Sequence, residues 1–320
     1  MQEFLGTDKQ VNKTDPVVSV CVVTYNHKHF IEQCIDGILN QKTNFPFELI
    51  IGEDDSKDGT RELCINYAEK YPDKIRLFLR NEKDKIWISG SKTGRFNFIE
   101  NLKAAKGKYI ALCEGDDYWT DSLKLQKQVD SLNGNEEIIG SYTDTYVKTE
   151  DYEELKYWRE PLQPTMTLND VIDKKSPFHT SSFLFRNKHL EKLPDWLNLV
   201  PSGDMFLFAY MALYGKLIKA NTSPTVYRKH EGGVTNSSIH NNQGFHIGRL
   251  FLWTKFKKEY NIELPKIDEV IRFHASSLLN SNMSISDINL VLKKIGFTQT
   301  ISIFGGRSLL KSTIKRILTK

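Results

Sequence analysis

The stretch "KYIALCEGDDYW", residues 108–119, decides the fold because an apolar strand pattern ends directly in an acidic cluster. Glu114, Asp116 and Asp117 follow the apolar run within four positions. Carboxylates this close together repel each other and raise one another's pKa values unless a positive group lies among them. A divalent metal ion, a basic side chain or plain solvent would each relieve that repulsion. The end of this strand is therefore a candidate functional site.

The chain before this stretch alternates between strand and helix patterns. Runs of apolar and β-branched residues predict strands, and apolar residues at helical spacing predict helices between them. The predicted strands are residues 17–25, 47–52, 74–80 and 108–113, and the predicted helices are residues 29–41, 60–71 and 94–107. Strands separated by helices favour an α/β fold, Rossmann-like, with a mostly parallel, doubly wound sheet.

The second half of the chain has weaker patterns. We expect a helix at 122–132, strands at 138–147 and 179–187, a short buried helix at 203–215, and a Gly-rich loop at 227–238. Residues 150–175 are acidic and Tyr-rich without a clear period, which predicts an irregular connection. Beyond residue 240 the pattern is mainly helical, so we expect a C-terminal helical extension.

Composition excludes several classes of protein. The chain has 320 residues, of which 39% are hydrophobic and 26% charged, as in an ordinary globular protein. Its net charge of +4 is too small to indicate a nucleic-acid partner. No apolar run approaches the roughly 20 residues of a membrane span, and the N-terminus lacks a signal-peptide pattern, so we expect a cytoplasmic protein.

The four cysteines are widely spaced and form no C-x-x-C pair. Each stands beside apolar residues, which is typical of reduced cysteines in a core rather than of disulfides or a zinc site. We assign them no chemical role.

Three polar clusters follow the first, second and fourth predicted strands. They are "TYNHKH" (24–29), "GEDDSKDGT" (52–60) and "EGDDYW" (114–119). Ligands of open α/β sheets bind outside the carboxyl ends of the strands, where such loops meet. Glycine-rich phosphate-binding motifs are absent from the sequence, so a bound diphosphate would depend on a metal held by the carboxylates. The sequence therefore predicts Mn²⁺ or Mg²⁺ as a cofactor.

Five segments together resemble a family 2 glycosyltransferase of the GT-A fold. They are residues 18–41, 47–60 and 104–119, the tripeptide "SGD" (202–204) and "YRKHEGG" (227–233). Their order and spacing carry the resemblance, which runs from about residue 17 to about residue 235. It implies an inverting, metal-dependent transfer of a sugar from a nucleotide diphosphate to a glycan or lipid-linked glycan, in surface polysaccharide synthesis.

The resemblance also divides the chain. Residues 1–15 would be an N-terminal extension, and residues 16–238 the GT-A domain. Within that domain, about 16–120 would bind the nucleotide sugar and about 121–238 the acceptor. Residues 239–320 would be a helical C-terminal region.

In this family the loops after the first two strands hold the nucleotide. The resemblance implies that Thr24 and Tyr25 contact the base, with Tyr25 against its ring. Asp54 would accept a hydrogen bond from the base imide, which favours UDP, and Glu53 would lie beside it. Capping of the helix that begins near Thr60 is the alternative role for Asp54, Asp55 and Asp58; for Asp58 we prefer it, and for Asp54 we prefer the nucleotide.

The acidic cluster matches the D-x-D-D element of the family. By this resemblance Glu114 and Asp116 lie near the ribose, while Asp116, Asp117 and His230 hold the metal, with Asp117 as the main ligand. The alternatives are a solvated acidic turn and an exposed loop histidine. Glu53 and Glu114 stand where many relatives have Asp, which affects the identity of the donor more than the type of reaction.

Asp204 falls where the family places its catalytic base. The alternative is a helix N-cap. Lys92 and Arg95 would meet donor phosphate or else remain solvated on the surface. His179 and Ser182 would line the acceptor side.

The C-terminal segment 304–320 has five basic residues, no acid, and apolar residues at helical spacing. A basic amphipathic helix of this kind binds an anionic membrane surface, and the alternative is packing on the domain.

Two other functions share part of this pattern. A sugar nucleotidylyltransferase would need a Gly-rich, basic loop after the first strand, which "TYNHKH" lacks. A non-catalytic nucleotide- or glycan-binding module would keep the acids without needing a base.

Overall fold

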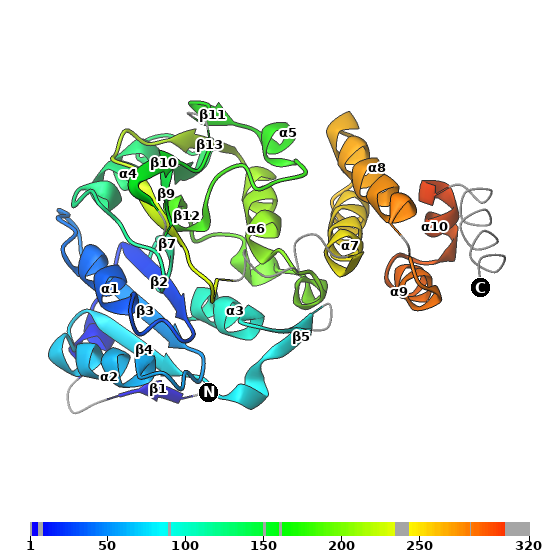
Figure 1. The fold of residues 1–320 in the computed structure, drawn as a ribbon. Helices are drawn as coiled ribbons and strands as arrows, with labels where there is room; N and C mark the ends of the chain where they lie inside the picture. The colour runs from blue at the N-terminus through cyan, green and yellow to red at the C-terminus, as the bar shows by residue number, and fades with distance from the viewer. Residues whose placement is uncertain are drawn as a thin grey trace.

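The computed structural model describes residues 2–5, 9–88, 91–149, 152–159, 162–233, 243–281 and 283–304. Within these residues one sheet has nine strands in the order β1-β4-β3-β2-β7-β12-β8-β13-β11 (Figure 1). They are β1 (Gln2–Phe4), β2 (Val18–Thr24), β3 (Phe47–Glu53), β4 (Ile75–Leu79), β7 (Tyr109–Glu114), β8 (Ile138–Tyr142), β11 (Thr165–Met166), β12 (Leu184–Arg186) and β13 (Lys216–Lys219).

The centre of this sheet is parallel. β2 pairs in parallel with β3 and β7, and β3 pairs in parallel with β4. β12 runs antiparallel to both of its neighbours, β7 and β8. The predicted α/β class with a mostly parallel sheet is confirmed, and β1, from the segment expected to precede the domain, pairs antiparallel with β4 at the sheet edge.

Helices cover both faces of the sheet, as Figure 1 shows. One apolar core lies between the sheet and α1 (Ile31–Leu39), α2 (Thr60–Lys70) and α4 (Lys124–Leu132). The other core contains residues of α3 (Arg95–Ala104) and α6 (Gly203–Ala212). All seven residues of β3 are buried, as burial on both faces of a parallel strand requires.

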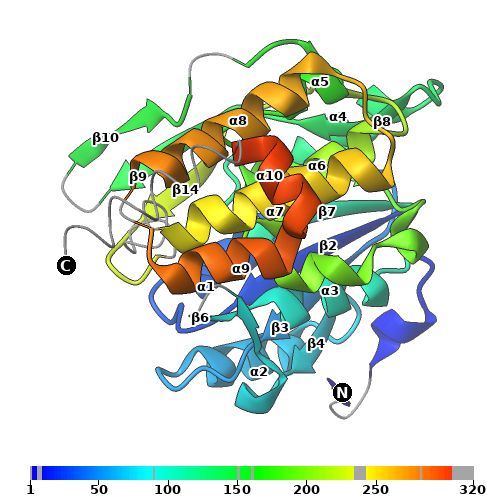
Figure 2. The same cartoon turned by 90° about the vertical axis from the view of Figure 1, so that its right-hand side faces the viewer.

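The C-terminal helices extend the second core. They are α7 (Gln243–Glu259), α8 (Pro265–Asn280), α9 (Ile285–Ile295) and α10 (Phe297–Phe304). Figure 2 shows α8 and α9 on either side of α7, and Figure 1 shows α7 between α6 and these helices. A Cβ atom at Gly248 of α7 would lie 2.4 Å from the Pro201 ring, so α7 packs directly against the segment before α6. The predicted helical extension is confirmed over these residues, whereas 305–320, the greater part of the basic tail, lies outside the described residues.

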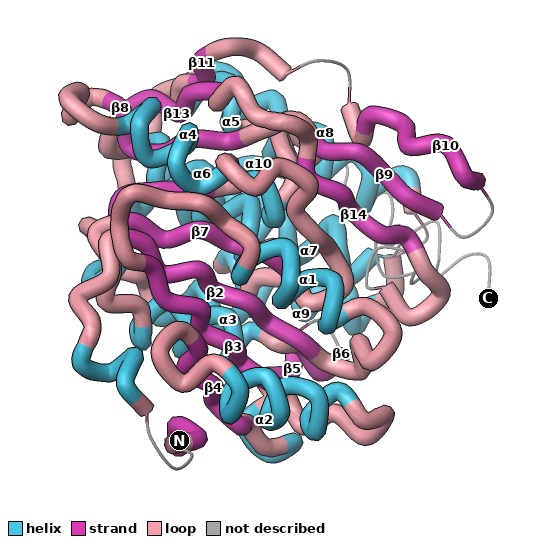
Figure 3. Tube along the Cα trace, turned by 90° about the vertical axis from the view of Figure 1, so that its left-hand side faces the viewer, coloured by secondary structure: helices cyan, strands magenta, loops and turns pink. Residues whose placement is uncertain are grey.

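A second sheet has the strand order β10-β9-β14. Its strands are β9 (Thr145–Thr149), β10 (Tyr152–Tyr157) and β14 (Thr225–Lys229), which lie side by side in Figure 3. A separate hairpin consists of β5 (Ile86–Ile88) and β6 (Ser91–Thr93). The short remaining helices are α5 (Leu168–Val171), η1 (Gln10–Lys13), η2 (Glu82–Asp84), η3 (Thr180–Ser182), η4 (Leu190–Lys192) and η5 (Asp195–Leu199).

Several predicted elements were wrong in detail. The single strand expected at 138–147 is two strands, because the chain leaves the large sheet after β8 and enters the second sheet with β9. Residues 150–175 contain β10, β11 and α5 rather than an irregular connection. The strand expected at 179–187 is regular only in β12, and the Gly-rich loop begins after β14. Pairing with strands distant in the sequence decided β9, β11 and β12, whereas β10 pairs with its neighbour β9.

The described part of the chain has no helix long and apolar enough to cross a membrane. The four cysteines are buried and none forms a disulfide, as the sequence predicts.

Candidate functional site

The polar loops after β2, β3 and β7 meet at one edge of the sheet. The strand register places Thr24 opposite Glu53, and Val23 opposite Glu114. The Asp54 amide donates to the Thr24 carbonyl over 3.0 Å, and the Gly115 amide donates to the Val23 carbonyl over 2.9 Å. The clusters that the sequence predicts as a site therefore begin at the same level of adjacent parallel strands.

Gly115 allows the acidic loop to approach the first loop. A Cβ atom at this position would lie 2.6 Å from the Oγ1 atom of Thr24 and 2.9 Å from the Nδ1 atom of His27. Neither neighbour has room to move away, because the Thr24 hydroxyl and the His27 ring lie 3.3 Å apart and contact each other. The glycine in "EGDD" is thus required by close packing.

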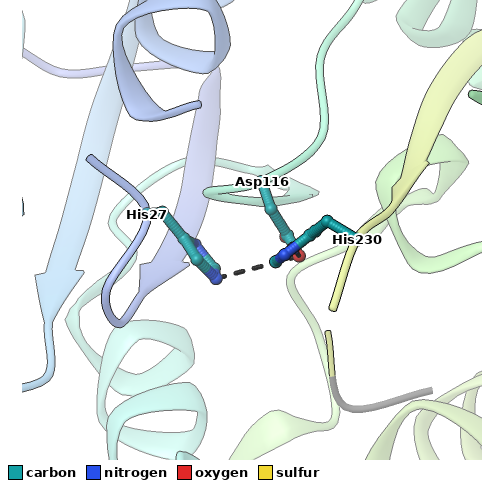
Figure 4. A group of neighbouring side chains, drawn as sticks. All are labelled: His27, Asp116 and His230. Carbon is teal, nitrogen blue, oxygen red and sulfur yellow. Dashed lines mark hydrogen bonds and ion pairs between the residues drawn. The ribbon is translucent and has the colours of Figure 1, made fainter. Parts of the chain in front are cut away.

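Asp116 lies between two histidines, and we call these three residues the His–Asp–His cluster (Figure 4). Its Oδ2 atom is 3.1 Å from the Nε2 atom of His230 and 3.7 Å from the Nε2 atom of His27. One ligand atom from each residue lies within 4.8 Å of the others, so one ion could be bound by all three. The sequence predicted Asp116 and His230 as metal ligands and the structure brings them together, whereas His27, which stands inside "TYNHKH", was missed.

The two histidines determine the electrostatics of Asp116. Burial pushes the pKa of its carboxyl upward, but the hydrogen bond to His230 and the charge of His27 outweigh this effect and lower the pKa. Burial lowers the pKa of His27, against the opposing attraction of Asp116. A neutral imidazole and an ionised carboxylate are the forms that bind a metal.

A second group, the acid–histidine cluster, consists of Glu114, Asp117 and His179, whose ligand atoms also lie within 4.8 Å of one another. The Oδ1 atom of Asp117 accepts a hydrogen bond of 3.1 Å from the Arg228 amide. Its buried Oδ2 atom accepts none from the described residues and lies 3.4 Å from the Nδ1 atom of His179. The predicted main metal ligand therefore has one carboxylate oxygen available for a cation.

Burial dominates the titration of the acid–histidine cluster. Burial and the charges of Asp116 and Asp204 raise the pKa of Glu114 to about 8. Burial, with repulsion from Asp116 and Glu114, raises the pKa of Asp117 well above its ordinary value, and burial lowers the pKa of His179 to about 4. Interaction with the histidines thus favours the ionised form of Asp116, whereas burial and the neighbouring carboxylates favour the protonated forms of Glu114 and Asp117.

Tyr25 and Asp54 form the opposite end of the site. The Tyr25 ring is 44% exposed, and the Nζ atom of Lys85 lies 3.5 Å from its centre. Burial raises the pKa of Asp54 to about 6 even though the charge of Lys85 opposes the shift. These three residues form a partly open surface with an aromatic ring and a buried carboxyl group, and Lys85 was not predicted.

One predicted donor contact, that of Glu53, needs correction. Glu53 is fully buried, and its carboxylate accepts a 2.6 Å hydrogen bond from the Ser56 amide and pairs with Arg61. Both oxygens are therefore occupied within its own loop rather than facing a nucleotide. Lys92 pairs with Glu82 at 2.5 Å on the surface, which agrees with the solvated alternative.

Asp58, for which capping was preferred, stands one residue before the N-cap of α2, which is Gly59, and binds the start of the helix from there. Its Oδ1 atom accepts from the Thr60 amide over 3.0 Å, and its Oδ2 atom accepts from the Lys28 amide over 3.0 Å. Asp58 thus stabilises the start of α2 and ties it to the first loop.

Asp204 is the second residue of α6, and the N-cap is Ser202. The helix-cap alternative for Asp204 is therefore wrong. Asp204 is half-buried, and its charge acts on Glu114 and His179, so it shares the site with the acidic residues.

Arg95 lies beside Asp204 and not on the surface. Its Nη2 atom donates to the Val200 carbonyl over 2.9 Å, and a Cβ atom on Gly203 would lie 1.3 Å from its Nη1 atom. Burial lowers the pKa of Arg95 and of Arg249, from α7, to about 10, while Asp204 raises both. Arg249 was not predicted as a residue of the site. It lies 45 positions after Asp204, and no pattern in the neighbouring sequence indicates that α7 packs near "SGD".

The two predicted acceptor residues have different positions. His179 is adjacent to the acidic residues, and its ring stacks on Tyr227 with centres 4.4 Å apart. Ser182 is fully buried, and its hydroxyl donates to the His179 carbonyl over 2.7 Å. Ser182 therefore holds the His179 turn and does not line an acceptor surface, which corrects that prediction.

The family described as Glycosyl transferase family 2 matches residues 19–193, more than half of the chain. The chain belongs to this family. The resemblance noted from the sequence is confirmed, and the glycosyltransferase class with it. Sugar nucleotidylyltransferases are thereby set aside.

Two curated relatives show how far the similarity of this family 2 chain extends. It is 32% identical over 235 residues to an uncharacterized protein of Mycobacterium tuberculosis, covering 71% of this chain and 63% of that protein. It thus spans less than two thirds of that relative. It is 27% identical over 227 residues to WfaP of Escherichia coli, named as a UDP-Glc:α-D-GlcNAc-diphosphoundecaprenol β-1,3-glucosyltransferase, covering 68% of this chain and 80% of that protein.

Solved structures confirm the GT-A fold. TarS of S. aureus, in complex with UDP-GlcNAc, has a TM-score of 0.57 at 16% identity, covering 91% of this chain and 82% of that chain. The mannosyltransferase PcManGT of Pyrobaculum calidifontis, in complex with GDP-Man and Mn²⁺, has a TM-score of 0.52 at 18% identity, covering 96% of this chain and 88% of that chain.

Proposed function

We propose that this chain is an inverting, metal-dependent glycosyltransferase that moves a sugar from a nucleotide diphosphate, with UDP as the preferred nucleotide, to a hydroxyl of a glycan or lipid-linked glycan. The observation that carries the proposal is the position of Asp204 beside the acidic cluster. Family 2 membership gives the class, and this arrangement supplies a base next to a candidate diphosphate site. Residues 16–238 would form the transferase domain.

The donor would lie along the edge formed by β3, β2 and β7. Tyr25 offers an exposed ring face for the base, and Asp54 offers a carboxylate for its imide N–H. A charge-assisted hydrogen bond of this kind discriminates bases that carry the N–H from those that do not. The similarity to TarS, which binds UDP-GlcNAc, supports UDP as the nucleotide, whereas PcManGT binds GDP-Man. The identity of the nucleotide is therefore the first point tested below.

The residues of the His–Asp–His cluster fit a divalent cation. Their ligand atoms converge within 4.8 Å, and a mixture of imidazole and carboxylate suits Mn²⁺ better than the all-oxygen shell that Mg²⁺ prefers. When bound, the ion supplies Lewis-acid stabilisation of the charge on the departing diphosphate. The buried Oδ2 atom of Asp117, which accepts no hydrogen bond from the described residues, is a further candidate ligand.

Asp204 would act as the general base. As an acceptor hydroxyl attacks the anomeric carbon, the proton of that hydroxyl passes to the Asp204 carboxylate. The new C–O bond forms on the face opposite the breaking bond to the diphosphate, whose oxygen keeps the electron pair. A single displacement inverts the configuration at that carbon.

The acceptor is proposed to be a glycan, carried on a lipid diphosphate as in the named activity of WfaP. Surface polysaccharide synthesis is the setting that fits such an acceptor. Contact with a membrane through the basic tail also remains a proposal, since most of the tail lies outside the described residues.

Calorimetric titration of the purified chain with UDP, GDP, CDP and dTDP, each with Mn²⁺ and with EDTA, tests the donor site. We expect binding that needs the metal and is tightest for UDP. Asp204→Asn should keep UDP affinity within about twofold and lose about 10²–10⁴-fold of the transfer rate. Asp130→Asn, an exposed change on α4, is the matched control and should keep both.

Three outcomes would contradict the proposal. No binding of any of the four nucleotides would remove the donor site. Wild-type rates of transfer by Asp204→Asn would exclude Asp204 as the general base. If the wild-type chain binds UDP in the presence of the metal but transfers no sugar, the chain is better described as a non-catalytic binding module.

A further inference from the structure

Strands β9 and β10 border an open surface cavity of about 610 Å³ outside the site described above. It is lined by Tyr146, Leu155, Lys156, Tyr157, Trp158 and Arg159. Three of these side chains are aromatic, and the remainder include two cationic groups. Sequence patterns predicted this segment to be an irregular connection, so the cavity exists only because β10 pairs with β9.

The cavity presents unusually exposed apolar groups. Tyr157 is 50% exposed and Leu155 is 41% exposed, and both belong to β10, whose register with β9 shifts between Tyr152 and Lys156. The Tyr146 and Tyr157 rings lie 4.8 Å apart across the strand pair and support each other. Large rings held in place but left open to solvent are typical of binding surfaces.

A continuous set of rings joins the cavity to the acidic residues. The Trp158 ring meets the His179 ring edge to face, with centres 5.6 Å apart. The Nδ1 atom of His179 lies 3.4 Å from the Oδ2 atom of Asp117. The Trp158 amide donates to the Thr145 carbonyl over 2.8 Å, which fixes this ring against the second sheet. The cavity therefore begins one side chain away from the acid–histidine cluster.

The topology places this cavity on the side away from the base pocket. The strand order β3-β2-β7-β12 has Asp54 directly after β3 at one end and the His179 turn directly before β12 at the other. The acidic cluster after β7 lies between them. A ligand in the cavity would thus approach the cluster from the side opposite a nucleotide base.

The chemistry of the cavity fits a saccharide. A pyranose ring has a face of C–H groups that packs on an aromatic ring and a rim of hydroxyls that bind polar groups, and Lys156 and Arg159 provide such groups. The Arg159 guanidinium lies 4.7 Å from the Trp158 ring centre, so ring and cation act together.

We propose that this cavity is an acceptor subsite that binds the glycan residues next to the sugar receiving the transferred group. This proposal rests on the proposed function, since it names the acceptor as an oligosaccharide rather than a single sugar. The β9–β10 hairpin holds the chain of the acceptor on Tyr157 and Trp158, and the terminal hydroxyl reaches the acidic cluster beside His179.

Ligand-observed NMR of the full chain with chitotriose, cellotriose and maltotriose tests the subsite. We expect at least one trisaccharide to bind the wild-type chain and Tyr157→Ala to bind it about fivefold more weakly or worse. Calorimetry with UDP and Mn²⁺ on the same proteins should give equal affinities. Tyr214→Ala, an exposed tyrosine at the end of α6 that does not line the cavity, is the matched control and should bind both ligands as the wild type does.

Failure of all three trisaccharides to bind the wild-type chain overturns the subsite, as does equal binding by Tyr157→Ala. If Tyr157→Ala does not fold, Leu155→Ser replaces another residue that lines the cavity, and we expect it to weaken trisaccharide binding in the same way. Absence of UDP binding by the wild-type chain would instead overturn the proposed function, while trisaccharide binding lost in Tyr157→Ala would still support a glycan site.

Discussion

The Nε2 atom of His230 lies 3.1 Å from the Oδ2 atom of Asp116, although the two residues are 114 positions apart in the chain. A short antiparallel bridge produces this contact: the Tyr118 amide donates to the Val226 carbonyl over 3.1 Å, and the Val226 amide donates back over 2.9 Å. The acidic loop of the large sheet is thereby joined to β14 of the second sheet. The candidate metal site depends on both sheets.

His27→Ala should weaken Mn²⁺ binding. One of three converging ligands is lost, and since even partners outside the ligand shell cost 10–100-fold in metal affinity, we expect a loss of about tenfold or more. Calorimetric titration of Mn²⁺ in the presence of UDP measures this. His29→Ala, an exposed histidine in the same loop, is the control and should bind as the wild type does. Equal affinities in all three proteins would exclude His27 as a ligand.

Glu114→Gln should make stability less dependent on pH. The folded chain holds the Glu114 proton up to about pH 8, whereas an unfolded glutamate releases it near 4.5. Between these values the folded state binds more protons, so the free energy of unfolding of the wild-type chain falls as pH rises. The variant cannot ionise, and its unfolding free energy should therefore change less over this window.

Urea denaturation without metal or nucleotide, at about pH 5 and about pH 8, measures the difference. Glu62→Gln, at an exposed position of α2, should keep the wild-type slope. An identical slope in Glu114→Gln would mean that Glu114 is ionised in the folded chain throughout.

Asp54→Asn should remove part of the pH dependence of UDP binding. Burial raises the Asp54 pKa to about 6, so its carboxylate forms only as pH rises through that value. The wild-type chain should therefore gain affinity between about pH 5 and pH 7.5, where the ionised group accepts the imide N–H more strongly. The phosphates of UDP titrate equally in both experiments, so the difference between the two proteins reports Asp54. Parallel curves would remove Asp54 from the base pocket.

Gly203→Ala should destabilise the fold. The added Cβ atom would overlap the Arg95 guanidinium, which is buried and bonded to Val200 and has no room to swing away. Overpacking of this kind costs about 1–3 kcal/mol, which urea denaturation measures. Gly94→Ala, whose Cβ atom would meet only ordinary contact at 3.7 Å, should cost less.

A double mutant separates this clash from other effects of Gly203→Ala. In an Arg95→Ala background the same substitution should cost distinctly less, because the overlapping group is absent. An equal cost in both backgrounds would show that Arg95 is not the reason.

The sequence predicted the donor half of the fold well because its signals are local. Strand and helix periods, and acids placed directly after strands, locate β2, β3, β7 and the loops that follow them. It predicted the second half poorly, because β9 and β14 pair with each other across about 80 residues, as in the parallel pairing of Thr145 with Thr225, and β10 is held in turn by β9. No local period records that pairing.

The residues of the site divide in the same way. Asp54, Asp116, Asp117 and Asp204 were predicted because each stands in a motif at the end of a strand or the start of a helix. His27 stood inside a quoted motif without a stated partner, and Arg249 had no local signal at all. Glu53 and Ser182 were predicted as ligand contacts, but burial gives both of them structural partners.

The sequence by itself determined the parallel α/β sheet, the family and the positions of the candidate site carboxylates, because strand periodicity and strand-end acids are properties of neighbouring residues. Only the tertiary structure decided which of these carboxylates are buried together and which lie beside a histidine or an arginine. Burial and proximity set the pKa of a group, and both depend on elements that meet in space: β14 carries His230 to Asp116, and α7 carries Arg249 toward Asp204.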